Sequence, residues 1–200
     1  GNFKQGADLI RQAIELDPDN PDYHNNLGMA SMQNGDPAGA IPSFEQAVTL
    51  KPRFAEAQFN LGNALMATGE DAAAEKHYRK AIRSRPDYVD ALNNLGNLLR
   101  QRGKANEAGQ LFRKVVKLAP DFAGGYFNLA LAVQAQANYE EAIEAFRRAL
   151  ELDDRPAHMW EALGHCLRQQ GALDDAEAAF DEALKRQPES TALLNALGLV

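Results

Sequence analysis

The chain is poor in cysteine and has no long apolar run. Cys166 is the only cysteine among 200 residues, so no disulfide can form within the chain. No stretch approaches the roughly 18 apolar residues that a transmembrane helix needs, and no signal peptide is recognisable. Because the chain begins with Gly1 rather than Met, we expect a fragment of a longer protein. We further expect no membrane insertion and a cytoplasmic location.

Positive charge is also scarce. The chain has 21 Lys and Arg against 28 Asp and Glu, which gives a net charge of −7. Nucleic acids and anionic membrane surfaces bind clustered Lys and Arg, so we expect no nucleic-acid partner. Hydrophobic residues make up 45 % of the sequence, which is enough for a core. Pro and Gly are modest in number, which argues against a disordered or collagen-like chain.

Several classes of residue return every 34 positions, which indicates a repeat protein. The prolines are Pro18, Pro52, Pro86, Pro120 and Pro188, with Asp154 in the fifth of the six places. The small turn residues are Gly35, Gly69, Gly103, Ala137 and Gly171. The core leucines are Leu27, Leu61, Leu95, Leu129 and Leu163. The aromatic residues are Phe44, Tyr78, Phe112, Phe146 and Phe180.

Each interval has the pattern of two helices. In residues 89–102, leucines fall at helical spacing, and Gly103 follows as a residue that tolerates the left-handed conformation. Residues 105–118 form a second apolar-periodic segment, and Pro120 ends it. Small residues recur on both segments, with Gly62 in one first helix and Ala74 in its second helix. We expect them to permit close helix packing, with the aromatic residue beside them.

These features resemble the tetratricopeptide repeat, with Leu-Gly in the first helix, Gly at the turn, Ala and an aromatic residue in the second helix, and Pro at the end. The resemblance covers the whole chain. It implies an all-α, right-handed superhelix of antiparallel helix pairs with a concave groove, as a single array over residues 1–200. Full repeats are expected at 21–54, 55–88, 89–122, 123–156 and 157–190. Residues 1–20 would be the second helix of a preceding repeat, and 191–200 the first helix of a following one.

Four departures from the pattern are expected to have local effects. Pro42 should kink or loosen the first turn of its helix. The repeat at 123–156 has Gly124 and Gly125 in its first helix and lacks the turn glycine, so Asn138 is expected to adopt the left-handed conformation. Near residues 153–156, where the terminal proline is missing, we expect the regular stacking to deviate.

An asparagine precedes the core leucine in four repeats, as Asn26, Asn60, Asn94 and Asn128. In stacked repeats these side chains would face the groove about 10 Å apart. An amide has one acceptor and two donors, which matches a peptide bond, and an extended peptide advances about 3.3 Å per residue. One asparagine would therefore serve about every third residue of a bound strand. The stretches "PDYHNNLG" and "PDFAGGYFNLA" resemble the repeats of O-linked N-acetylglucosamine transferases, which implies such backbone capture. The alternative is a structural role, with each amide bridging adjacent first helices or binding water.

Other groove positions would tune the choice of partner. They are Asp22, Glu56, Asp90, Asn63, Asn97, Arg100 and Arg168. The alternative for the charged ones is an ordinary solvated helix surface. Chaperone-binding relatives hold an acidic tail with Lys and Arg at specific groove positions. None of those residues is present, so we do not expect that ligand in the groove.

No catalytic motif is present. The sequence has no phosphate-binding loop, HExxH, paired cysteines or nucleophile elbow, so we expect no catalytic residue, no cofactor and no metal. His158, Glu161 and His165 share one helix face and could approach a divalent ion, but polar groove lining is the expected role. Cys166 and Trp160 are expected to pack in the core.

We therefore expect a protein–protein interaction scaffold, not an enzyme, that binds an extended peptide segment of a partner protein in its groove. Two alternatives remain open: a substrate-docking region of a larger enzyme such as a glycosyltransferase, and a self-assembly module. Apolar stripes on the first and last helices also predict end-to-end self-association. These stripes comprise Phe3, Ala7, Ile10, Ala13, Ile14, Leu193, Leu194, Leu197, Leu199 and Val200.

Overall fold

The computed structural model of the chain describes the backbone of residues 2–198 and the side chains of residues 6–198. Leu199, Val200 and the side chain of Phe3, which belong to the expected terminal stripes, lie outside this range. In residues 2–198 all regular structure is helical, and no helix there is both long enough and apolar enough to cross a membrane.

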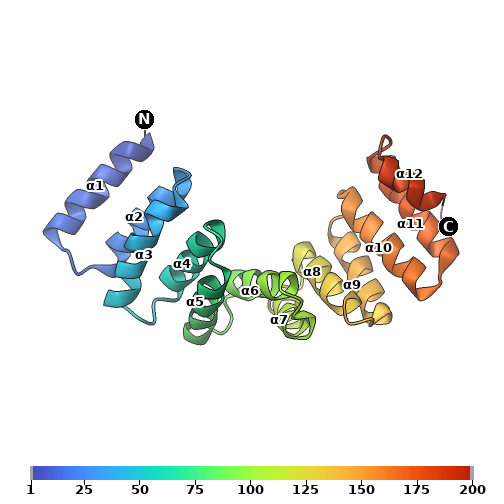
Figure 1. Ribbon diagram of the computed structural model, residues 1–200, viewed down its shortest axis with the longest axis horizontal. Coiled ribbons are helices and arrows are strands. Elements are labelled where there is room, and N and C mark those ends of the chain that lie inside the picture. Colours follow the sequence, from blue (N-terminus) through green and yellow to red (C-terminus); the bar gives the residue numbers. More distant parts are fainter. Residues whose placement is uncertain (1, 199–200) are drawn as a thin grey trace. The chain divides into compact units, whose positions relative to one another are not determined.

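Twelve helices follow one another along the described chain (Figure 1). They are α1 (Asn2–Leu16), α2 (Pro21–Gln33), α3 (Pro37–Leu50), α4 (Ala55–Ala67), α5 (Asp71–Ser84), α6 (Val89–Gln101), α7 (Ala105–Leu118), α8 (Ala123–Gln134), α9 (Tyr139–Leu152), α10 (Ala157–Gln170), α11 (Leu173–Arg186) and α12 (Thr191–Leu197). The helices α2, α4, α6, α8, α10 and α12 all begin at the first position of a repeat. The period in the sequence is thus the period of the helices.

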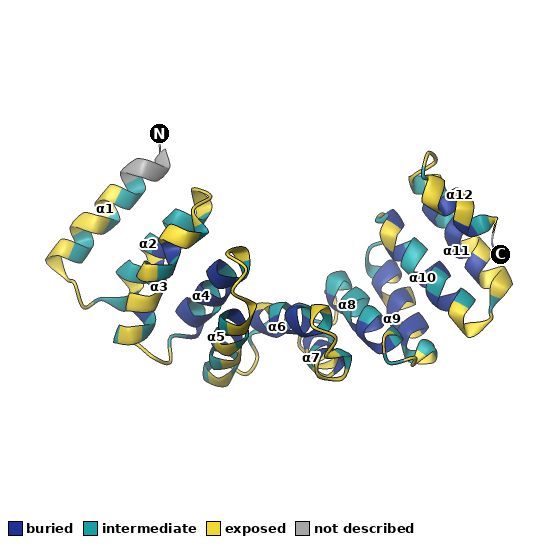
Figure 2. Ribbon diagram, in the orientation of Figure 1, coloured by how far each residue is buried: buried dark blue, intermediate teal, exposed yellow. Residues whose placement is uncertain are grey.

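The chain divides into two compact units, residues 1–98 and 99–200. In the first unit α2 packs on α3, α3 on α4, and α4 on α5; in the second, α7 packs on α8, α8 on α9, α9 on α10, and α10 on α11. Short connections between successive helices require antiparallel neighbours. Figure 2 shows buried residues on α4 and α9 and mostly exposed or half-buried residues on α1. The expected all-α solenoid of antiparallel helix pairs is confirmed.

In three helix pairs, α2–α3, α4–α5 and α10–α11, a glycine of the first helix packs against an aromatic ring of the second. A Cβ added to Gly62 on α4 would lie 2.7 Å from Cδ1 of Tyr78 on α5, which is closer than real carbon contacts allow. Gly28 and Gly164 have the same relation to Phe44 and Phe180. The five periodic aromatic side chains are all buried. The expected reason for the small residues, close approach of two helices, is therefore confirmed.

The turn before α9 differs from the expectation. Gly35, Gly69, Gly103 and Gly171 have positive φ angles, and in the fourth repeat the residue that does so is Ala137, with φ 57°. Asn138 was expected there and is instead the N-cap of α9, where its side chain accepts a hydrogen bond from the backbone N–H of Glu141. Asparagine is a preferred N-cap because its carbonyl satisfies an unpaired helix N–H. The left-handed conformation falls to the residue before it.

Pro42 lies inside α3, which continues from Pro37 to Leu50. The first turn is intact, because Asp36 accepts a hydrogen bond from Gly39 N–H at 2.8 Å and the backbone N–H of Ala40 donates to the carbonyl of Asp36. The expected loosening of this turn therefore does not interrupt the helix.

The turn at residues 153–156 lacks one backbone hydrogen bond that the other turns between repeats have, but the 34-residue spacing of the helices is unchanged. At other joints a backbone N–H donates to a carbonyl three residues earlier, as Phe54 does to Lys51. Pro156 occupies the same place and has no N–H to donate. The side chain of Arg155 pairs with Asp153 there, with Nε 2.8 Å from Oδ1. Since α10 still begins at the first position of its repeat, as α8 does, the expected break in regularity is limited to this turn.

Trp160 is half-buried, so its expected place in the core is wrong. Its indole N–H donates to the carbonyl of Asp154 at 2.9 Å, and the guanidinium of Arg186 lies 5.1 Å from its ring centroid. Three repeats earlier, Gln58 makes the same bond to the carbonyl of Pro52 at 3.0 Å. This position of the repeat therefore ties a first helix to the linker before it.

We predict that Ala137→Gly raises the free energy of unfolding by about 1 kcal/mol, because a residue with a Cβ pays about 1–2 kcal/mol in the left-handed region. Ala135→Gly is the matched control: Ala135 has φ −63°, so the added flexibility should lower stability by about 0.5–1 kcal/mol. Urea denaturation measures both. Equal effects of the two substitutions would contradict the strain at Ala137.

We also predict self-association through the terminal helices. Of the predicted stripes, Leu193 is fully buried and Ile10 half-buried, whereas Leu194 on α12 is 50 % exposed. Leu9 on α1, outside the predicted stripe, is 65 % exposed, and exposed apolar surface favours association. Leu9→Glu with Leu194→Glu should lower the weight-average mass in light scattering at high concentration. Leu118→Glu, on α7 and 41 % exposed, should leave the mass unchanged. A monomeric mass for the unaltered chain at every concentration would refute the prediction.

Candidate functional site

The predicted groove residues lie on the first helices of successive pairs. Asp22 and Asn26 are on α2; Glu56, Asn60 and Asn63 on α4; Asp90, Asn94, Asn97 and Arg100 on α6; Asn128 on α8; and Arg168 on α10. Those numbered up to 97 belong to the first compact unit, and Arg100, Asn128 and Arg168 to the second.

In the first unit the asparagine side chains form hydrogen bonds between successive first helices. Nδ2 of Asn60 on α4 donates to Oδ1 of Asn25 on α2 at 3.0 Å. Nδ2 of Asn94 on α6 donates to Oδ1 of Asn63 on α4 at 2.9 Å. The structure therefore supports the structural alternative for Asn60 and Asn94, since each bridges two first helices.

Tyr78 joins this network from the second helix of its pair. Its hydroxyl donates to Oδ1 of Asn63 at 2.8 Å, so Asn63 accepts from two partners. Burial raises the pKa of Tyr78 to about 12, against the opposing effect of a hydrogen bond with Asn94. The hydroxyl therefore keeps its proton at neutral pH and remains a donor. The side-chain amide of Asn63 is held by this arrangement in one orientation.

Asn25 and Tyr78 were not among the predicted site residues. Asn25 is buried, with 3 % of its surface exposed, whereas the predicted Asn26 is exposed and Asn60 is half-buried. The doubled asparagine at 25–26 was the available signal, because the two side chains point to different sides of a helix.

The acidic groove candidates are solvent-accessible. Asp22 and Asp90 are exposed and Glu56 is half-buried. Tyr88 lies near them: its pKa is raised by burial first and then by the negative charge of Glu56. The ring of Tyr88 is 5.0 Å from that of Phe59. Acidic groups and aromatic rings thus lie together at the α4–α6 junction.

In the second unit the basic candidate Arg168 contacts a histidine. Its Nη2 lies 3.0 Å from Nδ1 of His165, which must then accept the hydrogen bond. The ring of His165 is 5.0 Å from that of Phe180, and its Nε2 is 3.8 Å from Glu161. Within residues 6–198 no three or more His, Cys, Asp or Glu residues are grouped as metal ligands. His165 is therefore engaged by its neighbours in the polar lining.

The predicted groove residue Arg100 and the predicted core residue Cys166 are both buried at the atoms that matter for their roles. Nε of Arg100 is buried without a hydrogen-bond partner among the described residues. Cys166 is fully buried, and burial raises the pKa of its thiol to about 11. Its expected role in packing is confirmed, since such a thiol is not ionised at neutral pH.

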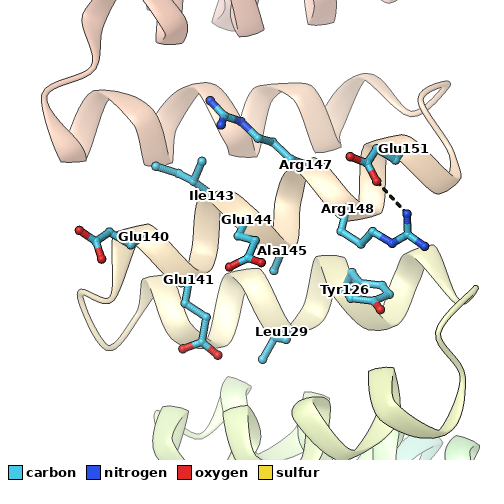
Figure 3. Close-up of a pocket in the computed structure, with 10 residues that line it drawn as sticks. All are labelled: Tyr126, Leu129, Glu140, Glu141, Ile143, Glu144, Ala145, Arg147, Arg148 and Glu151. Carbon is cyan, nitrogen blue, oxygen red and sulfur yellow. Dashed lines mark hydrogen bonds and ion pairs between the residues drawn. The ribbon is translucent and has the colours of Figure 1, made fainter.

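A hollow of about 680 Å³ lies on α8 and α9 (Figure 3). Tyr126 and Leu129 line it from α8, and Arg147, Arg148 and Glu151 are among the residues from α9. The basic groups there have acidic partners: Arg148 pairs with Glu151 at 2.8 Å and Arg147 with Asp175 at 3.3 Å. This hollow contains none of the predicted site residues, and both of its arginines are paired with acidic side chains.

Comparison with known proteins identifies the repeat. A family model described as tetratricopeptide repeat matches residues 1–52, 28–88 and 127–199, and a second model of the same description matches residues 87–155. The chain belongs to the tetratricopeptide repeat family. No curated protein matches it. The tetratricopeptide architecture explains why its first helices begin at the same position of every repeat.

Several solved tetratricopeptide structures share this fold at low sequence identity. YrrB, described as a TPR protein with an unusual peptide-binding site, has 20 % identity and a TM-score of 0.87, over 95 % of this chain and 98 % of that one. MamA of Desulfovibrio magneticus RS-1 has 22 % identity and a TM-score of 0.79, over 86 % and 97 %. PilF of Pseudomonas aeruginosa has 22 % identity and a TM-score of 0.74, over 88 % and 80 %. These likenesses establish the fold.

We predict that Asn94→Ala lowers the free energy of unfolding by about 1 kcal/mol relative to Asn26→Ala, since a hydrogen bond contributes about 0.5–1.5 kcal/mol net. Both substitutions remove an asparagine from a helix interior, so the gain in helix propensity cancels in the comparison. Of these two asparagines, Asn94 donates a hydrogen bond to a neighbouring first helix, and Asn26 does not, within residues 6–198. Chemical denaturation of the two variants gives the difference, and identical stabilities would mean that the bridge contributes nothing.

Proposed function

We propose that the chain is a non-catalytic protein-interaction scaffold, a single tetratricopeptide array over residues 1–200 with the repeats given above. Its first helices would form the wall of a groove that binds an extended peptide segment of a partner protein. The observation that carries this proposal is the fixed asparagine network of α2, α4 and α6.

The network leaves hydrogen-bonding capacity at the side chains that it holds. An amide has two N–H donors and an oxygen acceptor, and the bridges of Asn60 and Asn94 each use one donor. In the described residues no hydrogen bond is found at Oδ1 of Asn60 or of Asn94. The acceptor of each amide is thus available to a peptide bond, and Asn60 keeps a donor as well. The bridge lowers the entropy cost of binding, because it orients the amide in advance.

Bridging and peptide capture are therefore compatible, and we retain both roles for Asn60 and Asn94. The resemblance to the repeats of O-linked N-acetylglucosamine transferases supports capture of the peptide backbone. The peptide-binding site named for YrrB supports peptides as ligands of this architecture. The exposed Asp22 and Asp90 would favour a segment with basic side chains, since opposite charges steer association.

Peptide capture is tested with a peptide selected from a random library on the unaltered chain. Asn60→Ala, Asn94→Ala and Asn128→Ala together should weaken that peptide by about 10- to 1,000-fold, from ~0.5–1.5 kcal/mol per hydrogen bond. Titration calorimetry at a temperature where both proteins are folded, as judged by circular dichroism, measures the loss. Equal affinities would show that the asparagines act only between helices.

A second peptide separates backbone from side-chain recognition. N-methylation of every third peptide bond removes donors and keeps every side chain. If the amides bind the backbone, one methylation register should lose affinity and the others should lose less. Uniform tolerance of N-methylation would contradict backbone capture. A docking region of a larger enzyme would use the same groove, so the result also applies to that assignment.

A further inference from the structure

A hollow of about 620 Å³ lies outside the asparagine network, where α3 ends and α5 ends. Arg53, from the linker before α4, and Lys80 and Arg83, on α5, line it together with Ser84 and Thr49. We call these three cations and the space between them the basic hollow. All of its residues lie in the first compact unit.

No acidic residue lines the basic hollow. Among residues 6–198, Arg53, Lys80 and Arg83 make no ion pair. The surrounding stretch is also basic: residues 76–85 contain five of the 21 Lys and Arg of the chain and no Asp or Glu. This concentration contrasts with the net charge of −7 of the whole chain. Arg79 of this stretch is paired with Glu75 at 2.8 Å, and the charge of the hollow itself is opposite in sign to that of the molecule.

The repeat supplies an internal control for this arrangement. Lys80 and Arg83 lie on α5. Two repeats later, Arg148 and Glu151 of α9 occupy the same repeat positions. There the two side chains form an ion pair at 2.8 Å. In α5 the acidic member is replaced by Arg83, so two cations stand three residues apart, as Lys114 and Lys117 do in α7. Arg83 lies in the last turn of α5, where a cation suits the helix dipole, and there it adds a cation to the basic hollow where α9 has a carboxylate partner.

His77 lies next to the basic hollow and contacts its wall. Its pKa is lowered to about 4, first by burial and then by the positive charges of Lys80 and Lys76. The imidazole is neutral at neutral pH, and its Nδ1 lies 2.7 Å from Oε1 of Gln58 and donates to it. Gln58 is 2 % exposed and lines the hollow. Because His77 and Pro52 both hold its amide, this part of the wall is rigid.

We propose that the basic hollow binds a short acidic segment of a partner protein, with Asp or Glu carboxylates placed among Arg53, Lys80 and Arg83. The guanidinium forks of the two arginines match carboxylate oxygens in pairs, and the hydroxyl of Ser84 adds a donor. A short segment fits better than a nucleic acid, because the rest of this acidic chain repels a long polyanion. This surface is distinct from the groove under Proposed function and does not depend on it.

The probe is a fluorescein-labelled peptide of ten glutamates, measured by anisotropy at about 0.15 M salt, where charges outside the hollow are screened. Lys80→Glu with Arg83→Glu should weaken its binding at least about tenfold, because like charges in an interface are strongly unfavourable. Arg83→Glu also reproduces the residue that α9 has at the equivalent position, so the variant should fold. Lys114→Glu with Lys117→Glu is the matched control. These two residues lie at the same repeat positions of α7 and change the net charge equally.

The control pair should retain binding within about threefold, because neither lysine lines the basic hollow and exposed charges outside a site are screened by salt. The imidazole signals of His77 should move in NMR spectra when the peptide is added, and those of His158 and His165 should not. Equal loss of binding in both variant pairs would overturn the proposal, because it would show attraction by net charge only. Equal or tighter binding of a single-stranded oligonucleotide of the same charge would overturn the choice of an acidic protein segment. Changes to Asn60 and Asn94 leave this readout intact, so the two proposals fail separately.

Discussion

The contact between a small residue of the first helix and an aromatic ring of the second is the constraint on which the helix pairs depend, with glycine in α2, α4 and α10 and Ala130 in α8. At Gly62 any side chain would overlap the ring of Tyr78, so the helices approach as closely as their backbones permit. The contact also determines the polar network. Asn63 follows Gly62 directly, and the close approach brings the Tyr78 hydroxyl to its Oδ1 at 2.8 Å. Asn63 is thereby oriented to accept Asn94, and packing within one pair prepares the bridge to the next.

The period alone predicts most of this fold, because each helix pair needs a small residue, an aromatic ring and a left-handed turn residue in the same places, even where alanine replaces glycine. The helices α2 to α12 start where the repeat places them. The predictions for Asn138 and Trp160 were wrong, because each of these residue types suits two different structural positions. Asn138 suits both a left-handed turn and an N-cap, and the cap prevailed because it satisfies a backbone N–H of α9. Trp160 suits a core by size, but its N–H needs a partner, which it finds at the carbonyl of Asp154 near the surface.

The candidate site was less predictable, because side-chain partners depend on the offset between helices. The donor and acceptor of one bridge are 35 residues apart, Asn60 and Asn25, and those of the other are 31 apart, Asn94 and Asn63. The difference is about one helical turn, and residues one turn apart lie on the same face. The sequence period cannot select between them. The sequence predicts the recurrence of Asn60 and Asn94. It does not predict that Asn60 donates to Asn25 and not to Asn26.

Exposed charges are the least constrained part of the repeat. Arg113–Glu141 at 2.7 Å and Arg147–Asp175 at 3.3 Å are the same pair one repeat apart, joining successive second helices. Such exposed pairs contribute at most about 1 kcal/mol each, less than a core aromatic residue. Exposed positions of the repeat can therefore change sign without loss of the fold, as Glu151 in α9 and Arg83 in α5, at one and the same repeat position, illustrate. Stability resides in buried positions that every repeat shares, so differences between repeats at exposed positions are where selection for a partner can act.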